Sequence, residues 1–294
     1  MDMLEKTLNF TIAHYLDPQS VVQSELSQAH FVMFDTYVPG GIYHSAQLNW
    51  KGDLSFVHSP KEFIRSKRER EQVEASRTYF LEHGYEIKTE IVNEEKCQEF
   101  LKVYAQTTLK KDRAIDYNAH IIIQKNLLTG IPVFLFGLYK DGVLESGLLV
   151  AEYKNEFRVM FGAKKRYDQV RGGIGGVLEI EMMKFCFDKK IQKISHGLSA
   201  NPAGITDNAG IFEFKTRYGF TAFPVGEWHT TFVLNKDINL TELVFLTIKD
   251  SQLSYLILGK DPETIKKYQS RLITQVGFQD MDEHIANAHK LLNI

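Results

Sequence analysis

The alternation of apolar and polar residues predicts regular secondary structure from about Gly84 onward. Residues 85–92 alternate as a half-buried strand does, and residues 97–108 place apolar side chains at helical spacing. Asn93 is a favoured N-cap, and the acidic residues directly after it suit the positive end of a helix dipole. We therefore predict a strand and then a helix that ends near residue 111.

A second helical run over about residues 118–128 precedes a predicted hairpin. The apolar runs 133–139 and 146–153 flank the dipeptide Asp141-Gly142. This dipeptide suits a type I′ turn, whose twist matches that of antiparallel strands. The hairpin is therefore the strongest short-range prediction in the chain.

A glycine-rich turn links a third predicted strand, residues 157–162, to an apolar helical segment, residues 177–188. The turn spans residues 169–176 and has the sequence QVRGGIGG. Glycines allow a ligand to approach the backbone, and a helix N-terminus adds partial positive charge. The predicted helix also lacks a Ser, Thr or Asp cap for its first N–H groups. The pattern predicts a phosphate-bearing donor beside a splayed sheet, and a merely mobile turn is the alternative.

The same rules predict the other elements. They are strands at 30–36, 43–49 and 53–57, a long helix at 60–83, a strand at 191–195, a helix near 210–218, and paired strands at 220–224 and 228–234. Near the C-terminus, Asp261-Pro262 begins a predicted helix that continues through residue 272, and residues 282–292 form a closing helix. We expect these two helices to pack on the core and to bury four side chains, Leu272, Ile273, Ile285 and Leu291.

Composition narrows the class of protein. With 294 residues, of which 44% are hydrophobic, the chain can bury a large core, and its net charge of −2 gives no general attraction to nucleic acid. No segment approaches the roughly 18 apolar residues of a membrane span, so we expect a cytoplasmic protein without a membrane partner. Cys97 and Cys186 lie on apolar helix faces and are predicted to be buried thiols. The histidines are scattered, so we expect no metal site.

The order of elements over residues 84–235 resembles the GNAT superfamily of acyl-CoA transferases. Gly173 and Gly175 match the two glycines of the family's motif A, although Val170 stands at the leading position, where Gln or Arg is usual. The resemblance implies an α/β fold with a mixed sheet, acetyl-CoA or another acyl-CoA as co-substrate, and a small amine or peptide as acceptor. It also implies that the donor is bound by Arg171, Gly172, Gly173, Ile174, Gly175, Gly176 and Asn201.

A narrower resemblance concerns residues 214–220, FKTRYGF, which are similar to the Phe-Lys-x-x-Phe-Gly ending of Fem-type, peptidoglycan aminoacyltransferase-like proteins. It implies three segments: residues 1–83 as a reduced first module, 84–235 as the acyltransferase core, and 236–294 as a helical extension. Two alternatives to the CoA enzyme follow. One is an aminoacyltransferase that uses aminoacyl-tRNA, and the other is a GNAT-fold binding module without turnover. The basic residues between 61 and 70 could line a tRNA groove, but glutamates interrupt them.

Acyl transfer to an amine needs a base for the amine proton and stabilisation of developing negative charge. Lys215 is the candidate for charge stabilisation, and His196, directly after a predicted strand, is the candidate base. Glu152 and Glu156 are fallback bases. Beyond these, Asn201 and Asn208 could orient the donor amides, and Tyr218 is expected to pack in the core.

Overall fold

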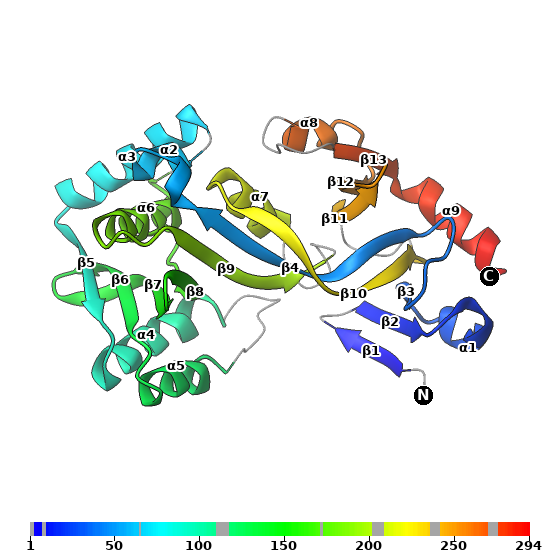
Figure 1. The fold of residues 1–294 in the computed structure, drawn as a ribbon, viewed down its shortest axis with the longest axis horizontal. Coiled ribbons are helices and arrows are strands. Elements are labelled where there is room, and N and C mark those ends of the chain that lie inside the picture. Colours follow the sequence, from blue (N-terminus) through cyan, green and yellow to red (C-terminus); the bar gives the residue numbers. More distant parts are fainter. Residues whose placement is uncertain are drawn as a thin grey trace. The chain divides into compact units, whose positions relative to one another are not determined.

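The structure is a computed structural model (Figure 1). It describes residues 3–7, 10–64, 66–109, 118–170, 173–201, 209–235, 242–269 and 276–294. The chain forms two compact units. Unit 1 comprises Met1–Asn49, Leu198–Thr216 and Ala222–Ile294, and unit 2 comprises Trp50–Gly197 and Arg217–Thr221. The units alternate along the chain, whereas the sequence analysis divided it into three consecutive segments.

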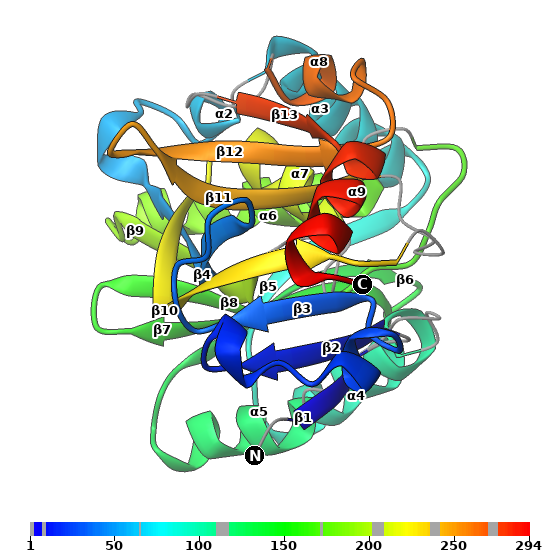
Figure 2. The ribbon, with the colours of Figure 1, turned by 90° about the vertical axis from the view of Figure 1, so that its right-hand side faces the viewer.

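Unit 1 is built on neighbouring strands that come from both ends of the chain (Figure 2). They are β1 (Met3–Thr7), β2 (Phe10–Tyr15), β3 (Phe31–Phe34), β10 (Thr221–Val233) and β4 (Ile42–Asp53). The first residue of β10 and the last four residues of β4 are counted with unit 2. β2 runs parallel to β3, and β10 runs antiparallel to it. Alternate residues of β3 face two apolar clusters, one containing Phe31 and the other Val32. The sheet is therefore covered on both faces.

The C-terminal part of unit 1 differs from its prediction. Two strands, β11 (Glu242–Lys249) and β12 (Gln252–Gly259), form a hairpin, and β13 (Val276–Asp280) pairs with β12. Only helices were predicted here, since a short continuous apolar run fits a buried helix as well as a buried strand. Asp250 and Ser251 both have positive φ and close the β11–β12 turn.

The two predicted C-terminal helices are present as α8 (Thr264–Gln269) and α9 (Met281–Leu292). Ile285 is buried as predicted, but Leu291 is exposed. Leu272 and Ile273 lie outside the described residues. Since α9 contributes to both apolar clusters, through Ile285 and Ala288, it is an integral part of unit 1.

Unit 2 contains an antiparallel meander of β5 (Tyr85–Ile91), β6 (Val133–Lys140), β7 (Val143–Tyr153) and β8 (Glu156–Ala163). Asp141 and Gly142 have φ values of 51° and 78°, as a type I′ turn requires, so the predicted hairpin is confirmed. β9 (Lys193–Ala200) begins in this unit and runs parallel to β8.

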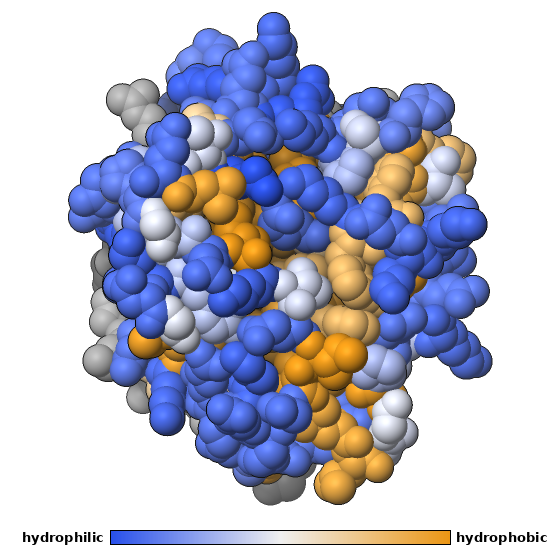
Figure 3. All heavy atoms as spheres, turned by 90° about the vertical axis from the view of Figure 1, so that its left-hand side faces the viewer, coloured by the Kyte–Doolittle hydropathy of each residue, from blue (hydrophilic) through white to orange (hydrophobic). Residues whose placement is uncertain are grey.

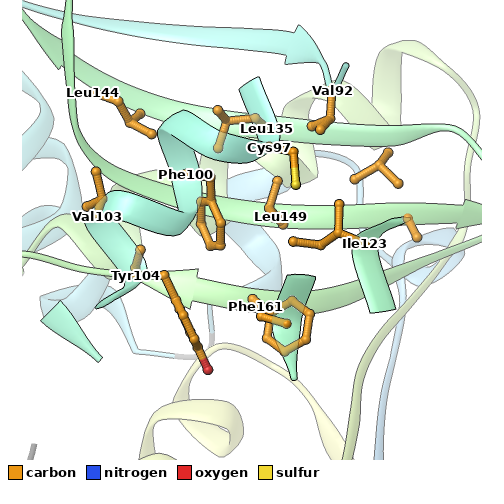
Figure 4. Close-up of a cluster of buried hydrophobic side chains, with 14 of the residues drawn as sticks. Val92, Cys97, Phe100, Val103, Tyr104, Ile123, Leu135, Leu144, Leu149 and Phe161 are labelled. Carbon is orange, nitrogen blue, oxygen red and sulfur yellow. The ribbon is translucent and has the colours of Figure 1, made fainter. Parts of the chain in front are cut away.

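Helices cover both faces of this meander. α4 (Glu94–Thr107) and α5 (Ala119–Leu128) pack on one face, where Phe100 and Ile123 meet Leu135 and Leu149 (Figure 4). α6 (Gly173–Asp188) packs on the other face. The ring of Phe185 in α6 stacks against Phe157. The fold thus holds α6 firmly along most of its length.

The predicted helix at 60–83 is interrupted. It forms α2 (Pro60–Phe63) and α3 (Lys67–Glu82), because the backbone of Ile64 is extended and Ser66 caps a new helix. The predicted strand at 53–57 is part of β4 and a 3-10 turn at Leu54–Phe56.

The face in Figure 3 is mostly hydrophilic, with hydrophobic areas among polar side chains. None of the described helices is long and apolar enough to cross a membrane.

The observed element order is β5, α4, α5, β6, β7, β8, α6, β9, α7 (Ala209–Arg217) and β10. This is the order of elements on which the resemblance rested, and the predicted α/β fold with a mixed sheet is confirmed. One element differs. Residues 220–224 and 228–234 were predicted as a hairpin but belong to the single strand β10, because Gly226, at a φ of 81°, does not reverse the chain.

Candidate active site

Strands β8 and β9 separate in the middle of unit 2. Their pairing covers Glu156↔Lys193, Phe157↔Ile194 and Arg158↔Ser195, yet both strands continue beyond it. β8 stays paired with β7, and a register shift next to Val150 bulges β8 at this level. The predicted splay of the sheet is therefore present, and His196 is the first residue of β9 beyond the paired segment.

The glycine-rich turn leads into α6, which begins at Gly173. Gly173 has a φ of 61°, a conformation that favours glycine, and its N–H donates to the carbonyl of Val170 at 3.2 Å. Ile174 is buried and fixes the first turn against the core. Arg171 and Gly172 lie outside the described residues. The N–H groups in the first turn of an α-helix have no partner within the helix and can bind an anion.

Gly175 and Gly176 have different surroundings. A Cβ atom at Gly176 would lie 2.0 Å from Oη of Tyr218 and 2.7 Å from Cγ2 of Val73, so this glycine permits close packing. A Cβ atom at Gly175 would lie 3.2 Å from Nζ of Lys164. Gly175 therefore brings the helix start next to a cation, and Gly176 holds the helix against its neighbours.

A buried carboxylate joins this cation to the candidate base. Glu179 is one turn after Gly175 on α6 and is fully buried. Its Oε1 lies 3.8 Å from Nζ of Lys164, and its Oε2 lies 3.0 Å from Nε2 of His196. A buried carboxylate needs such partners, because removing an unpaired charge from water is costly. The side chains of Lys164, Glu179 and His196 thus form a continuous row that starts at the glycine turn.

The sequence analysis identified His196 but missed Lys164 and Glu179. A signal for Glu179 was present, since it falls outside the polar stripe of Glu181, Lys184 and Asp188 on the same helix. A carboxylate on the apolar side of a buried helix calls for a charged or hydrogen-bonding partner. Lys164 had no such signal, because it is one of several cations after β8.

Two aromatic residues complete the surroundings. The ring of Phe220 packs edge-on against His196, with ring centroids 4.2 Å apart. Tyr218 is buried, and burial together with the nearby carboxylates of Glu179 and Glu69 raises its pKa. Its phenol therefore keeps its proton at neutral pH and can act as a donor.

Lys215 and Asn201 belong to unit 1. Lys215 is a buried residue of α7. Asn201 is also buried, and its amide donates to Oγ of Ser45 at 3.1 Å and to the carbonyl of Leu246 at 3.0 Å. Its Oδ1 accepts from the N–H of Leu246, so Asn201 connects segments within unit 1. Its predicted contact with the donor, and the predicted role of Lys215, stay predictions.

The other predicted residues have these positions. Glu156 pairs with Arg158 at 3.3 Å, and Glu152 is at the end of β7. Asn208 lies outside the described residues. Cys97 and Cys186 are buried free thiols, as predicted, and burial raises their pKa values to about 11 and about 12. Neither thiol is therefore ionised at neutral pH.

Unit 1 contains a separate hollow of about 670 Å³. Its lining includes Tyr37, Tyr43, Lys249, Tyr255 and Phe278. The volume is in the range of small-molecule sites, roughly 300–1,000 Å³.

No protein-family model matches this chain, and no curated protein matches it. Solved structures with a similar chain path include FemX, at 13% identity and a TM-score of 0.44, covering 77% of this chain and 82% of that one. L-PGS from Bacillus licheniformis has 14% identity and a TM-score of 0.41, covering 75% and 77%. A tandem GNAT protein from the clavulanic acid biosynthesis pathway has 13% identity and a TM-score of 0.39, covering 75% and 74%. Similarities at this level assign neither donor nor acceptor.

Proposed function

We propose that this protein is an N-acyltransferase that moves an acyl group from acyl-CoA to an amine. The observation that carries the proposal is the parting of β8 and β9 at His196, beside the glycine-rich start of α6 and Lys164. A helix start of this kind can bind a phosphate-bearing donor. In this proposal the acyl group lies in the gap between the two strands. The order of elements around the gap resembles that of GNAT enzymes.

In this proposal the donor's pyrophosphate binds at the first turn of α6. The N–H groups of Ile174, Gly175 and Gly176 supply dipoles, and the ammonium of Lys164, which also pairs with Glu179, lies next to Gly175. Arg171 and Gly172 precede this turn in the chain and are proposed to contribute further donor contacts. The absence of side chains at the glycines allows the phosphate to approach the backbone.

The chemistry follows from the pair of His196 and Glu179. When Nε2–H of His196 donates to Glu179, the carboxylate fixes the tautomer in which Nδ1 accepts a proton. The amine attacks the thioester carbon, a C–N bond forms, and its proton passes to His196 as the C–S bond breaks. His196 then returns this proton to the departing thiolate, so that an amide and a neutral thiol leave the site. Lys215 is proposed to offset the negative charge that develops.

The charge pattern of α2 and α3 supports acyl-CoA over aminoacyl-tRNA as the proposed donor. Binding of tRNA needs cations that can face phosphates along a backbone. In the region of α2 and α3 the cations Lys61, Lys67 and Arg77 are paired with Glu74, Glu71 and Glu181. These pairs blunt the positive field that a tRNA groove would require.

Calorimetric titration of CoA into wild-type protein, Lys164→Met and Lys165→Met tests the proposal. Lys165 is the matched control, since it follows Lys164 directly and pairs with Glu145 at 2.8 Å. We expect Lys164→Met to weaken CoA binding about tenfold, in line with the loss of one charge-assisted contact. Lys165→Met is expected to bind as the wild type does.

Parallel arms of this experiment address the alternatives. Wild-type protein that binds tRNA but not CoA would replace our proposal with the aminoacyltransferase. Protein that binds CoA but acylates no member of a panel of small amines and peptides would indicate a binding module. Equal CoA affinity in both lysine variants would remove Lys164 from the donor site.

A further inference from the structure

Within the described part of unit 1, two histidines and an aspartate meet. The side chains are His14, Asp35 and His229, and their potential ligand atoms lie within 4.8 Å of one another. Nε2 of His14 is 2.5 Å from Oδ1 of Asp35, and Nδ1 of His229 is 3.0 Å from the same oxygen. Three residues far apart in the sequence thus converge on a single point.

The sheet register explains the convergence. His14 of β2 pairs with Met33 of β3, and Thr230 of β10 pairs with Phe34 of β3. Because side chains alternate between faces, residues two apart share one face. Three parallel rows on that face therefore end at the cluster: Phe10, Ile12 and His14; Phe31, Met33 and Asp35; Val233, Thr231 and His229. At the opposite end of the rows, Phe10, Phe31 and Val233 belong to one buried apolar cluster.

The backbone around the cluster is held firmly. The hydroxyl of Thr230 donates to the carbonyl of Thr36 at 2.7 Å, and it accepts from the N–H of Val38 at 3.0 Å. The N–H of Asp35 also donates to the carbonyl of Tyr15 at 3.1 Å. These bonds join the segment after β3 to both neighbouring strands, so the three side chains start from fixed positions.

The three side chains of the cluster differ in their exposure to solvent. His229 is 8% exposed, whereas Asp35 is 30% and His14 is 40% exposed. Behind it lies His44, which is close enough to His229 for electrostatic interaction. Both nitrogens of His44 are hydrogen bonded, and burial lowers its pKa to about 4, so it adds no positive charge. The cluster therefore has a fixed inner side and an outer side that solvent reaches.

We propose that His14, Asp35 and His229 bind a divalent transition-metal ion of the zinc class. Two imidazole nitrogens and one carboxylate oxygen favour such ions over Mg²⁺ or Ca²⁺, which prefer oxygen ligands. Zinc bonds of about 2.0–2.1 Å separate tetrahedral ligand atoms by about 3.3 Å. Small rotations of the two exposed side chains, His14 and Asp35, open the present spacing to that value. A fourth position faces solvent and is available to water or an anionic ligand.

Titration of Zn²⁺ into chelator-treated protein, followed by calorimetry and by thermal unfolding, tests this site. We expect the wild type to bind one zinc ion with micromolar or tighter affinity and to unfold at a higher temperature with zinc. His14→Ala and Asp35→Asn are each expected to weaken zinc binding by about tenfold or more, since each removes one of the protein ligands.

The matched control is His120→Ala, which removes an exposed histidine from unit 2. It is expected to leave zinc affinity unchanged and so measures adventitious binding to surface imidazoles. Cobalt substitution adds a spectroscopic readout, because Co²⁺ with nitrogen ligands gives visible absorption that should be lost in His14→Ala. Wild-type protein that binds no zinc at micromolar concentrations, or His14→Ala that binds it equally well, would overturn the proposal. In that event the aspartate only accepts hydrogen bonds from two imidazoles.

Discussion

Both units of this protein pair histidine with a carboxylate, but they do so at different depths. In unit 2 a single imidazole, His196, contacts the fully buried Glu179. In unit 1 two imidazoles contact Asp35, whose side chain is partly exposed. A buried pair fixes one tautomer and one ring orientation, which suits proton transfer. A partly exposed carboxylate between two imidazoles suits metal binding instead, because a metal ion can replace the protons of the hydrogen bonds between them.

Among the substitutions that test this comparison, we expect Glu179→Gln to have the largest effect on turnover. The amide keeps the shape of the side chain but removes the charge that fixes His196, so turnover should fall by on the order of 10²–10⁴-fold. Steady-state acylation kinetics measure it, and thermal unfolding checks that the fold persists. Glu181→Gln is the control, because Glu181 lies on the same helix and pairs with Arg77. Turnover of Glu179→Gln close to that of the control would make the buried pair structural.

Lys215→Met tests whether a residue of unit 1 takes part in the chemistry. The substitution removes the charge but keeps most of the apolar stem. If the cation offsets developing negative charge, turnover should drop on the order of 100-fold with little change in the melting temperature. A fall in stability with unchanged turnover would assign Lys215 to the core of α7 instead.

Substitutions of the two adjacent glycines should separate packing from donor binding. Gly176→Ala places a methyl group against Tyr218 and Val73 and should destabilise the fold by about 1–3 kcal/mol. Gly175→Ala meets only the flexible end of Lys164, so it should affect CoA affinity more than stability. Denaturant unfolding and CoA calorimetry on both variants provide the comparison. A larger loss of stability in Gly175→Ala than in Gly176→Ala would contradict the close packing of Gly176 against Tyr218 and Val73.

The last effect concerns stability alone, through the acid sensitivity of unit 1. Burial lowers the pKa of His284 from 6.5 to about 4, so its neutral form stabilises the folded state. This stabilisation is complete above pH 6.5 and is lost as the pH falls toward 4, because the unfolded chain binds the extra proton. The loss per group is at most about 1.4 kcal/mol per pH unit.

His284→Gln should therefore flatten the decline of unfolding free energy between pH 6.5 and 4. Its side-chain oxygen can still accept from the N–H of Val233, which now donates to Nε2 of His284 at 3.2 Å. His120→Gln, in unit 2, is the control. A slope equal to that of the wild type would mean that His284 does not titrate in this range.

Local patterns predicted unit 2 well and unit 1 poorly, and the reason is physical. The cap at Asn93 and the turn at Asp141-Gly142 depend on neighbours in sequence, and both were confirmed. The strands β11 to β13 and the single strand β10 depend on distant partners, and they were missed. The residues of the candidate sites also differ in whether neighbours in sequence or distant partners determine them. The glycine turn and His196 could be predicted from the sequence, whereas Lys164 and the cluster at Asp35 required folded geometry.

The alternation of the two units along the chain has a consequence for folding kinetics. The hydrogen bond from Val38 to Thr230 joins residues 192 positions apart, and it lies within unit 1. Long-range pairing of this kind slows folding, because the chain loses loop entropy before native contacts compensate for it. In unit 2 the connections β6–β7 and β7–β8 are short, so these three strands can pair before β10 pairs with β3. We therefore expect a refolding intermediate in which the amides of β6 and β7 are protected from exchange. In this intermediate the apolar faces of β2 and β3 are still exposed and can bind chaperones.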